Sequence, residues 1–187
     1  MGQEHPEISE KLADFIRAQH VFFVATAPSG AAGHVNVSPK GLDTLAILGP
    51  GRVAYLDLTG SGIETVAHLR DNGRITLMFC AFEGKSKVVR LHGHGAAHTI
   101  GTAAFDELSV HFPHLPGRRA VIDVEVERVS TSCGFGVPLM DFVTERTEMS
   151  EWVERKGGDA GLTEYRGLRN ATSIDGLTGW SSPPAGR

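Results

Sequence analysis

The stretch AVIDVEVERV at residues 120–129 decides the fold class, because apolar and charged side chains alternate along it. Such alternation is typical of a β-strand with one buried face, with Ile122, Val124 and Val126 facing inward. Turn residues separate further runs of β character. These runs are RITLMFCAF at 74–82, KVVRLHGH at 87–94, and shorter segments at 20–27, 33–37, 44–48 and 52–58. A Ser-Pro-Lys-Gly turn is expected directly after the run at 33–37. The chain is therefore expected to form six or seven strands, a number typical of a small barrel or sandwich.

Helical patterns flank these strands. An amphipathic segment at 6–19 has Pro6 in the first helical position, and a second segment at 61–72 has Ser61 and Glu64 at capping-box spacing. Gly73 is expected to end the second helix. Further helices are expected at 102–112, 149–156 and 161–169. The sequence thus predicts a mainly β fold with flanking helices.

The length of 187 residues and the hydrophobic content of 41% favour a single domain over residues 1–187. The barrel is expected over about 20–130 and a C-terminal arm over 131–187. The formal net charge of −4 and the lack of a Lys/Arg stripe argue against nucleic acid as a partner. We see no signal peptide, no apolar run that could span a membrane and no cysteine framework, so we expect a cytoplasmic protein.

The order of elements from about Val21 to Ser130 resembles the FMN-binding split barrel of the pyridoxamine 5′-phosphate oxidase-like superfamily. Three stretches carry the resemblance: Val37-Ser38-Pro39-Lys40-Gly41, Ser61-Gly62-Ile63, and Val88-Val89-Arg90-Leu91-His92-Gly93. In the family the first lysine binds the FMN phosphate, the second stretch reads Ser-Arg-Lys and also binds phosphate, and the third begins with glutamine. Here Lys40 is present, but Gly62 and Ile63 replace the arginine and lysine of the second stretch, and Val88 replaces the glutamine of the third. These departures argue against a true pyridoxamine phosphate oxidase.

Three segments look closer to another branch of the superfamily: Asn36–Gly41, Thr131–Pro138 and Asn170–Leu177. They specify no substrate. The resemblance implies an FMN-binding homodimer, with the cofactor at the subunit interface, and an FMN-dependent oxidoreductase that acts on an unknown small molecule. We assign no catalytic residue, because in many flavin reactions the cofactor carries the chemistry.

Candidate cofactor-binding residues fall into three groups. A phosphate dianion needs cations or oriented donors, which Ser38, Lys40 and Ser61 could supply; the alternative is that Ser61 only caps a helix and Lys40 only faces water. Arg90 and Lys87 form a second basic group that could contact ligand or remain solvated. The flavin ring needs a close-packed wall, for which the candidates are Cys133, Gly134, Phe135 and, from the second subunit, Trp180.

Three other interpretations keep the barrel: a haem protein, a deazaflavin protein and a non-catalytic sensor. His92, His94 and His98 have even spacing on a strand, which would suit an axial haem ligand, with His92 or His94 first in line. No matching acidic ligand accompanies them, so we expect no metal site. A deazaflavin would need a wider basic groove, and a non-catalytic flavin-binding sensor would share the same cleft.

Overall fold

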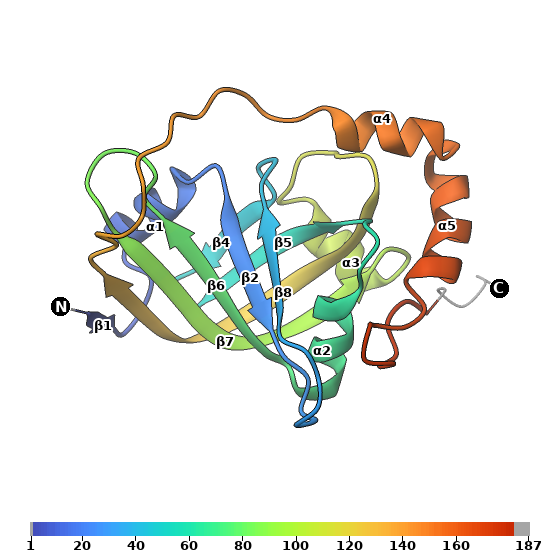
Figure 1. Cartoon of the computed structure of the whole chain (residues 1–187), viewed down its shortest axis with the longest axis horizontal. Helices are drawn as coiled ribbons and strands as arrows, with labels where there is room; N and C mark the ends of the chain where they lie inside the picture. The colour runs from blue at the N-terminus through green and yellow to red at the C-terminus, as the bar shows by residue number, and fades with distance from the viewer. Residues whose placement is uncertain (1, 182–187) are drawn as a thin grey trace.

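The computed structural model describes residues 2–181. They form one antiparallel sheet, whose strands differ in length, with helices around it (Figure 1). The strand order is β3-β2-β6-β7-β8-β5-β4, and β1 pairs with the far end of β8. The strands are β1 Gln3–His5, β2 Phe22–Thr26, β3 Asn36–Lys40, β4 Leu45–Gly49, β5 Arg52–Leu58, β6 Arg74–Cys80, β7 Val88–Thr99 and β8 Arg118–Ser132. The helices are α1 Glu10–Arg17, α2 Glu64–Asn72, α3 Ala103–Ser109, α4 Glu148–Arg155 and α5 Gly158–Arg169.

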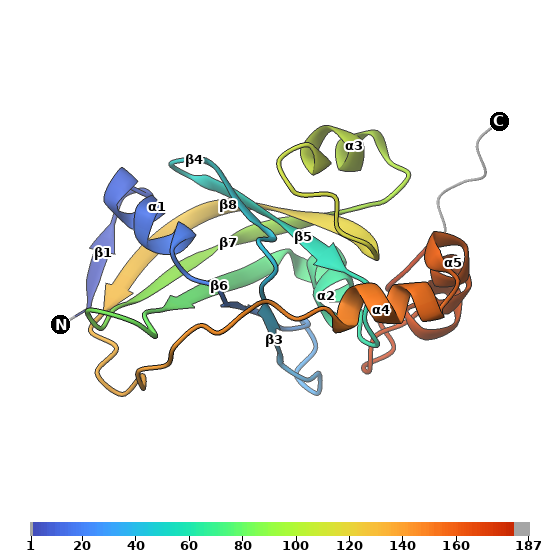
Figure 2. The ribbon, with the colours of Figure 1, turned by 90° about the horizontal axis from the view of Figure 1, so that it is seen from above.

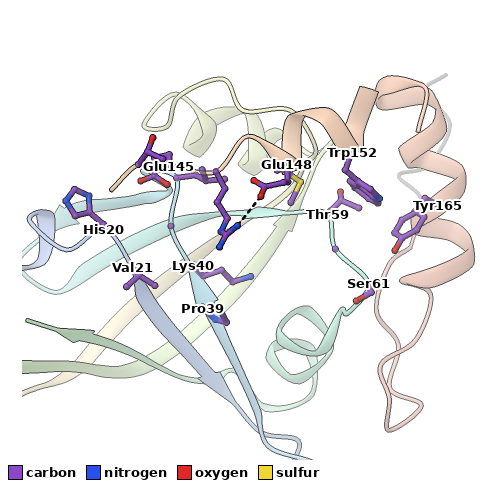
Figure 3. Close-up of a pocket in the computed structure, with 16 residues that line it drawn as sticks. His20, Val21, Pro39, Lys40, Thr59, Ser61, Glu145, Glu148, Trp152 and Tyr165 are labelled. Carbon is purple, nitrogen blue, oxygen red and sulfur yellow. Dashed lines mark hydrogen bonds and ion pairs between the residues drawn. The ribbon is translucent and has the colours of Figure 1, made fainter. Parts of the chain in front are cut away.

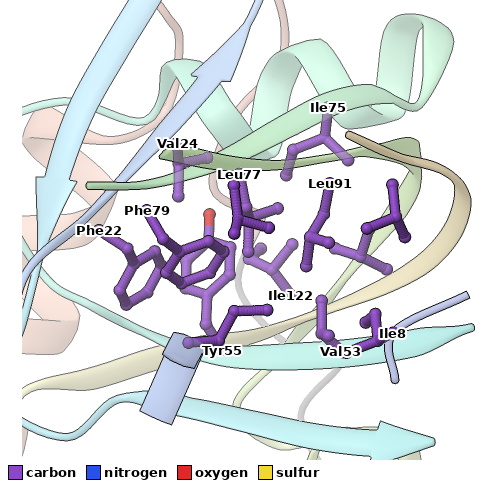
Figure 4. Packing of buried hydrophobic residues seen from close by; sticks show 14 of the residues in the cluster. Ile8, Phe22, Val24, Val53, Tyr55, Ile75, Leu77, Phe79, Leu91 and Ile122 are labelled. Atoms are coloured by element: carbon purple, nitrogen blue, oxygen red, sulfur yellow. The ribbon is translucent and has the colours of Figure 1, made fainter. Parts of the chain in front are cut away.

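The curved sheet encloses the main hydrophobic core. Side chains from β2, β5, β6, β7 and β8 meet there, with Phe22 packed edge-on against Tyr55 and stacked with Phe79 (Figure 4). The two helices α1 and α2 contribute to this core from opposite ends of the barrel (Figures 1 and 2). The alternating strand is confirmed: Ile122 and Val124 are fully buried, whereas Glu125 is exposed. The split-barrel fold expected from the sequence is therefore the fold observed.

A second apolar cluster lies on the outer face of the barrel. Phe105 of α3 packs there against Leu56 of β5 and Val121 of β8. Figure 2 shows α3 on one side of the sheet and the connection from β8 to α4 on the other. The connection, residues 133–147, contains no helix or strand. No helix within residues 2–181 is both long and apolar enough to cross a lipid bilayer.

Three local expectations were wrong. The Ser-Pro-Lys-Gly stretch is not a turn: Ser38, Pro39 and Lys40 lie inside β3, where an edge strand tolerates proline because it need not donate on its open side. The first helix begins at Glu10 rather than at Pro6, because the chain before it is held in an extended course: residues 3–5 pair with β8, and the Ile8 N–H donates to the Pro50 carbonyl. The expected strand at 33–37 is displaced to Asn36–Lys40 by its pairing with β2.

The start of α2 also differs from the expected capping box. The helix begins at Glu64 with Ile63 in the capping position and no side-chain cap, so Ser61 lies in the preceding loop. Its end is as expected, since Gly73 adopts φ +73°, a left-handed conformation that glycine tolerates. The C-terminal arm holds α4 and α5 as expected, and its last residues, 182–187, lie outside the described part of the chain.

Candidate functional site

A cavity of about 760 Å³ lies between the barrel and the C-terminal arm. That volume falls within the range typical of small-molecule sites, about 300–1,000 Å³. The barrel side includes Lys40 of β3 and the loop between β5 and α2, and the arm side includes Trp152 and Tyr165 (Figure 3). Segments more than 80 residues apart in the sequence thus form the two walls.

Lys40 reaches this cavity because of its register in β3. It pairs with Phe22, whose side chain is in the core, so both side chains are on the inner face of the sheet. The Lys40 Nζ donates to Asp57 Oδ1 at 3.0 Å and lies 5.8 Å from the centre of the Tyr55 ring. Its side chain is 19% exposed, so the ammonium group is held in place at the base of the cavity.

Asp57 joins Lys40 to a second cation. Its side chain is 1% exposed, and its Oδ2 accepts from Arg119 Nε at 2.8 Å and lies 2.7 Å from Arg119 Nη2. Burial alone would raise the pKa of Asp57, but Arg119 and Lys40 together hold that pKa below its ordinary value. The group is therefore a carboxylate at neutral pH, and it fixes both cations near the loop that follows β5.

The loop Thr59–Gly62 is held through its carbonyl groups. Asn170 Nδ2 donates to the Gly60 carbonyl at 3.0 Å and to that of Ser61 at 3.4 Å, while Arg119 Nη1 donates to the Gly62 carbonyl at 2.8 Å. Within residues 2–181, no acceptor takes the backbone N–H groups of Gly60, Ser61 or Gly62. These donors are free to bind an oxygen of a ligand.

Thr59 anchors the same loop on the other side. Its backbone N–H and its hydroxyl both donate to the Gly117 carbonyl, at 2.8 and 2.9 Å. The hydroxyl also accepts from Arg166 Nε of α5 at 2.9 Å. The α5 helix therefore stabilises the loop directly.

The arm supplies an aromatic wall opposite Lys40. Trp152 of α4 and Tyr165 of α5 pack edge to face, with ring centres 5.1 Å apart. Figure 3 shows Lys40 and Ser61 on the barrel side, with Trp152 and Tyr165 across from them. Nearby, Arg146 and Glu148 form a 3.0 Å ion pair at the exposed rim. A flat, partly apolar ring system suits such a wall, and an anionic group suits the opposite side.

Of the residues predicted from the sequence, Lys40 and Ser61 line this cavity and the others do not. Ser38 lies two residues before Lys40 in β3, and its hydroxyl donates to Asn36 Oδ1 at 3.3 Å. Lys87 lies 4.7 Å from the Phe15 ring centre, and Arg90 donates to Ser132 at 3.2 Å.

The remaining predicted residues belong to the arm. Cys133 and Gly134 begin the connection after β8, followed by Phe135, which is 84% exposed. Trp180 is 6% exposed and lies 5.2 Å from the Arg166 guanidinium of its own chain.

The sequence reasoning missed the residues beneath the loop: Asp57, Arg119, Arg166 and Asn170. Two of them carried a readable signal. Asp57 stands among apolar residues in the strand stretch YLDL, where an acidic side chain is buried only if it has partners. Asn170 opens the Asn170–Leu177 segment that marks the branch. Nothing local in the sequence indicates that Arg119 or Arg166 turns inward.

The histidines proposed as haem ligands, His92, His94 and His98, lie outside this cavity, whereas His20 lines it. His92 Nδ1 is 3.1 Å from Thr76 Oγ1, and His94 Nδ1 is 2.8 Å from Glu127 Oε1, both on the outer side of the barrel. Burial, together with Arg128 and Arg90, lowers the pKa of His92, so its imidazole is neutral at pH 7. In the described range of the chain, no group of three His, Cys, Asp or Glu side chains is placed to hold a metal ion.

Comparison with known proteins identifies relatives of this chain in sequence and in structure. The sequence model of pyridoxamine 5′-phosphate oxidase matches residues 8–133. The pyridoxamine 5′-phosphate oxidase family protein ustO of Aspergillus flavus is 38% identical over 194 residues, covering 95% of this chain and 78% of ustO.

Two solved structures share the fold. A single-site variant of HupZ from Group A Streptococcus is 25% identical with a TM-score of 0.52, over 67% of this chain and 99% of HupZ. A protein of Lactobacillus delbrueckii, described as a putative pyridoxamine 5′-phosphate oxidase, is 18% identical with a TM-score of 0.51, over 67% and 94% of the two chains.

Proposed function

The chain belongs to the pyridoxamine 5′-phosphate oxidase family, and from that premise we propose that it is a flavoprotein that binds FMN. The observation that carries the proposal is the cavity between barrel and arm. One side of it offers the Lys40 ammonium and the free N–H groups of Gly60 and Ser61, and the other side offers Trp152 and Tyr165.

The residues present fit FMN in charge and in shape. The phosphate monoester is a dianion, and it would bind Lys40 and the N–H groups of Gly60, Ser61 and Gly62. The isoalloxazine ring is flat and would lie against the aromatic pair of the arm. When bound, FMN supplies the redox chemistry, and the protein binds it, orients it and limits access of water.

We propose an oxidoreductase that acts on a small molecule. The Ser61-Gly62-Ile63 stretch lacks the family's two cations, and this departure argues against a true pyridoxamine phosphate oxidase. The arm encloses one side of the cavity and so limits the size of a substrate. A cytoplasmic location stays a prediction.

Equilibrium titration tests whether the cavity is the FMN site. FMN fluorescence should be quenched on binding to the wild-type chain, and Lys40→Gln should weaken binding by about tenfold, because a charge-assisted contact to the phosphate is lost. Lys11→Gln is the matched control, since Lys11 is exposed on α1. Equal affinities for wild type and Lys40→Gln would show that FMN binds elsewhere.

We further propose that the protein is a homodimer. The support is a set of exposed apolar side chains on the edge strand and on the connection to α4: Val37 at 62%, Phe135 at 84%, Leu139 at 77% and Val143 at 88%. Soluble proteins seldom leave several large apolar residues of neighbouring segments in water unless another surface covers them. Light scattering should give the mass of two chains at micromolar concentration. A mass of one chain at all concentrations would rule the dimer out.

A further inference from the structure

Positive charge accumulates beneath the loop Thr59–Gly62. Arg119 is 4% exposed and Arg166 is 3% exposed, and Lys40 is adjacent to them. Asp57 is the carboxylate paired with both Lys40 and Arg119. Lys40, Arg119 and Arg166 outnumber Asp57 by two charges, and the Glu64 carboxylate beside Gly62 reduces this excess to one positive charge.

Arg166 is the less compensated of the two arginines. Its Nε donates to Thr59 Oγ1 at 2.9 Å, its Nη2 donates to the Arg118 carbonyl at 2.9 Å, and its guanidinium lies over the Trp180 ring. Within residues 2–181, no carboxylate lies at ion-pair distance from it. Burial, followed by repulsion from Arg119, lowers the pKa of Arg166.

A buried cation without a counterion is costly, because its loss of hydration is repaid only by hydrogen bonds. Arg166 is such a group, whereas Arg119 is paired with Asp57. Both arginines contact the loop, since Arg119 donates to the Gly62 carbonyl and Arg166 donates to Thr59. Charges act over longer distances in a buried setting than in water, so both raise the affinity of the loop for an anion without touching it.

We propose that Arg119 and Arg166 supply, from behind the loop, the positive charge that binds the phosphate of the ligand. They would replace the two cations that the family carries in the loop itself and that are absent here at Gly62 and Ile63. This inference rests on the proposed FMN function. Arg119 and Arg166 are positioning residues in this scheme, together with Asn170, which holds the loop carbonyls so that the N–H groups remain free.

The inference makes the C-terminal arm part of the phosphate site. Arg166 and Asn170 both come from the end of α5, and Asn170 Oδ1 also accepts from Arg119 Nη1 at 3.0 Å. It also defines the ligand class, because charge of this kind favours phosphate monoesters over neutral molecules of the same shape.

The test compares FMN with riboflavin, which has the same ring and no phosphate. Wild type should bind FMN more tightly, and Arg166→Gln should reduce that preference by about tenfold, mainly through weaker FMN binding. Arg166→Lys keeps the charge and should keep most of the preference. Asn170→Asp adds a negative charge next to Arg119 in a side chain of the same shape, and it should reduce the preference in the same way.

The outcomes separate the alternatives. Equal losses for both flavins in the folded variants would overturn the inference, because they would show a purely structural role. An unchanged preference would overturn it too. If none of the three variants unfolds cooperatively, competition on the wild-type chain decides. Inorganic phosphate should compete with FMN but not with riboflavin, and a lack of competition overturns the inference. Wild type that binds neither flavin would instead refute the proposed function.

Discussion

Replacement of Asp57 by asparagine should destabilise the protein by about 3–5 kcal/mol, the cost typical of breaking a buried ion pair from one side. Asp57 is 1% exposed and takes contacts of 2.7 to 3.0 Å from two cations. Asparagine has nearly the same shape, so it creates no cavity. The loss comes from Arg119 and Lys40, which would remain buried without their counterion. For a chain of this size the melting temperature should fall by about 6–20 °C.

Urea unfolding at several pH values measures this effect and its origin. The pKa of Asp57 is lower in the folded state than in the unfolded chain. Its contribution to stability is therefore complete above the unfolded pKa, about 3.9, and is lost as the pH falls through the lower folded pKa. Wild type should lose this contribution in acid, and Asp57→Asn should lack it.

Asp123→Asn is the matched control for this experiment. Asp123 pairs with Arg52 at 2.7 Å, but the Arg52 side chain is 50% exposed, so the change should cost less than about 1 kcal/mol. A loss of less than 1 kcal/mol in Asp57→Asn at pH 7 would refute the account of the buried charge cluster.

Three further changes test other parts of the structure. Gly93→Ala should destabilise the barrel by about 3 kcal/mol in urea unfolding, since a Cβ there would overlap the Glu125 carbonyl oxygen. A neutral effect would contradict the close strand approach at the bulge. Leu42 has φ +60°, so Leu42→Val should cost about 1–2 kcal/mol and Leu42→Gly less than about 1 kcal/mol, and equal losses would contradict backbone strain at the cavity edge. Glu64→Gln should strengthen FMN binding about two- to fivefold in a fluorescence titration, because a Glu64 carboxylate oxygen lies against Gly62; weaker binding would place the phosphate elsewhere.

Much of the fold could be predicted from local patterns. The alternation at 120–129 determines which side chains of β8 are buried, and Gly73 ends α2 because its left-handed conformation is readily available only to glycine. The order of strands does not follow from these patterns. Pairing between distant segments such as β5 and β8 depends on the packing of the whole sheet.

Less of the candidate site could be predicted, and the reason is the same. Lys40 and Ser61 were identified from motif positions, and both line the cavity. The inward turn of Arg119 depends on a register shift between β5 and β8 near Asp57. The contact of Asn170 with the loop depends on how the arm returns to the barrel. Long-range contacts of this kind leave no periodic signal in a single sequence.

The absorbance spectrum of the purified protein, with mass analysis of the compound that heat releases, tests the central claim most directly. The account predicts flavin bands near ~375 and ~450 nm and a released mass equal to that of FMN. A protein that is colourless and does not bind added FMN would contradict the claim. A Soret band would also contradict it, and would direct attention to His92 and His94 on the outer side of the barrel.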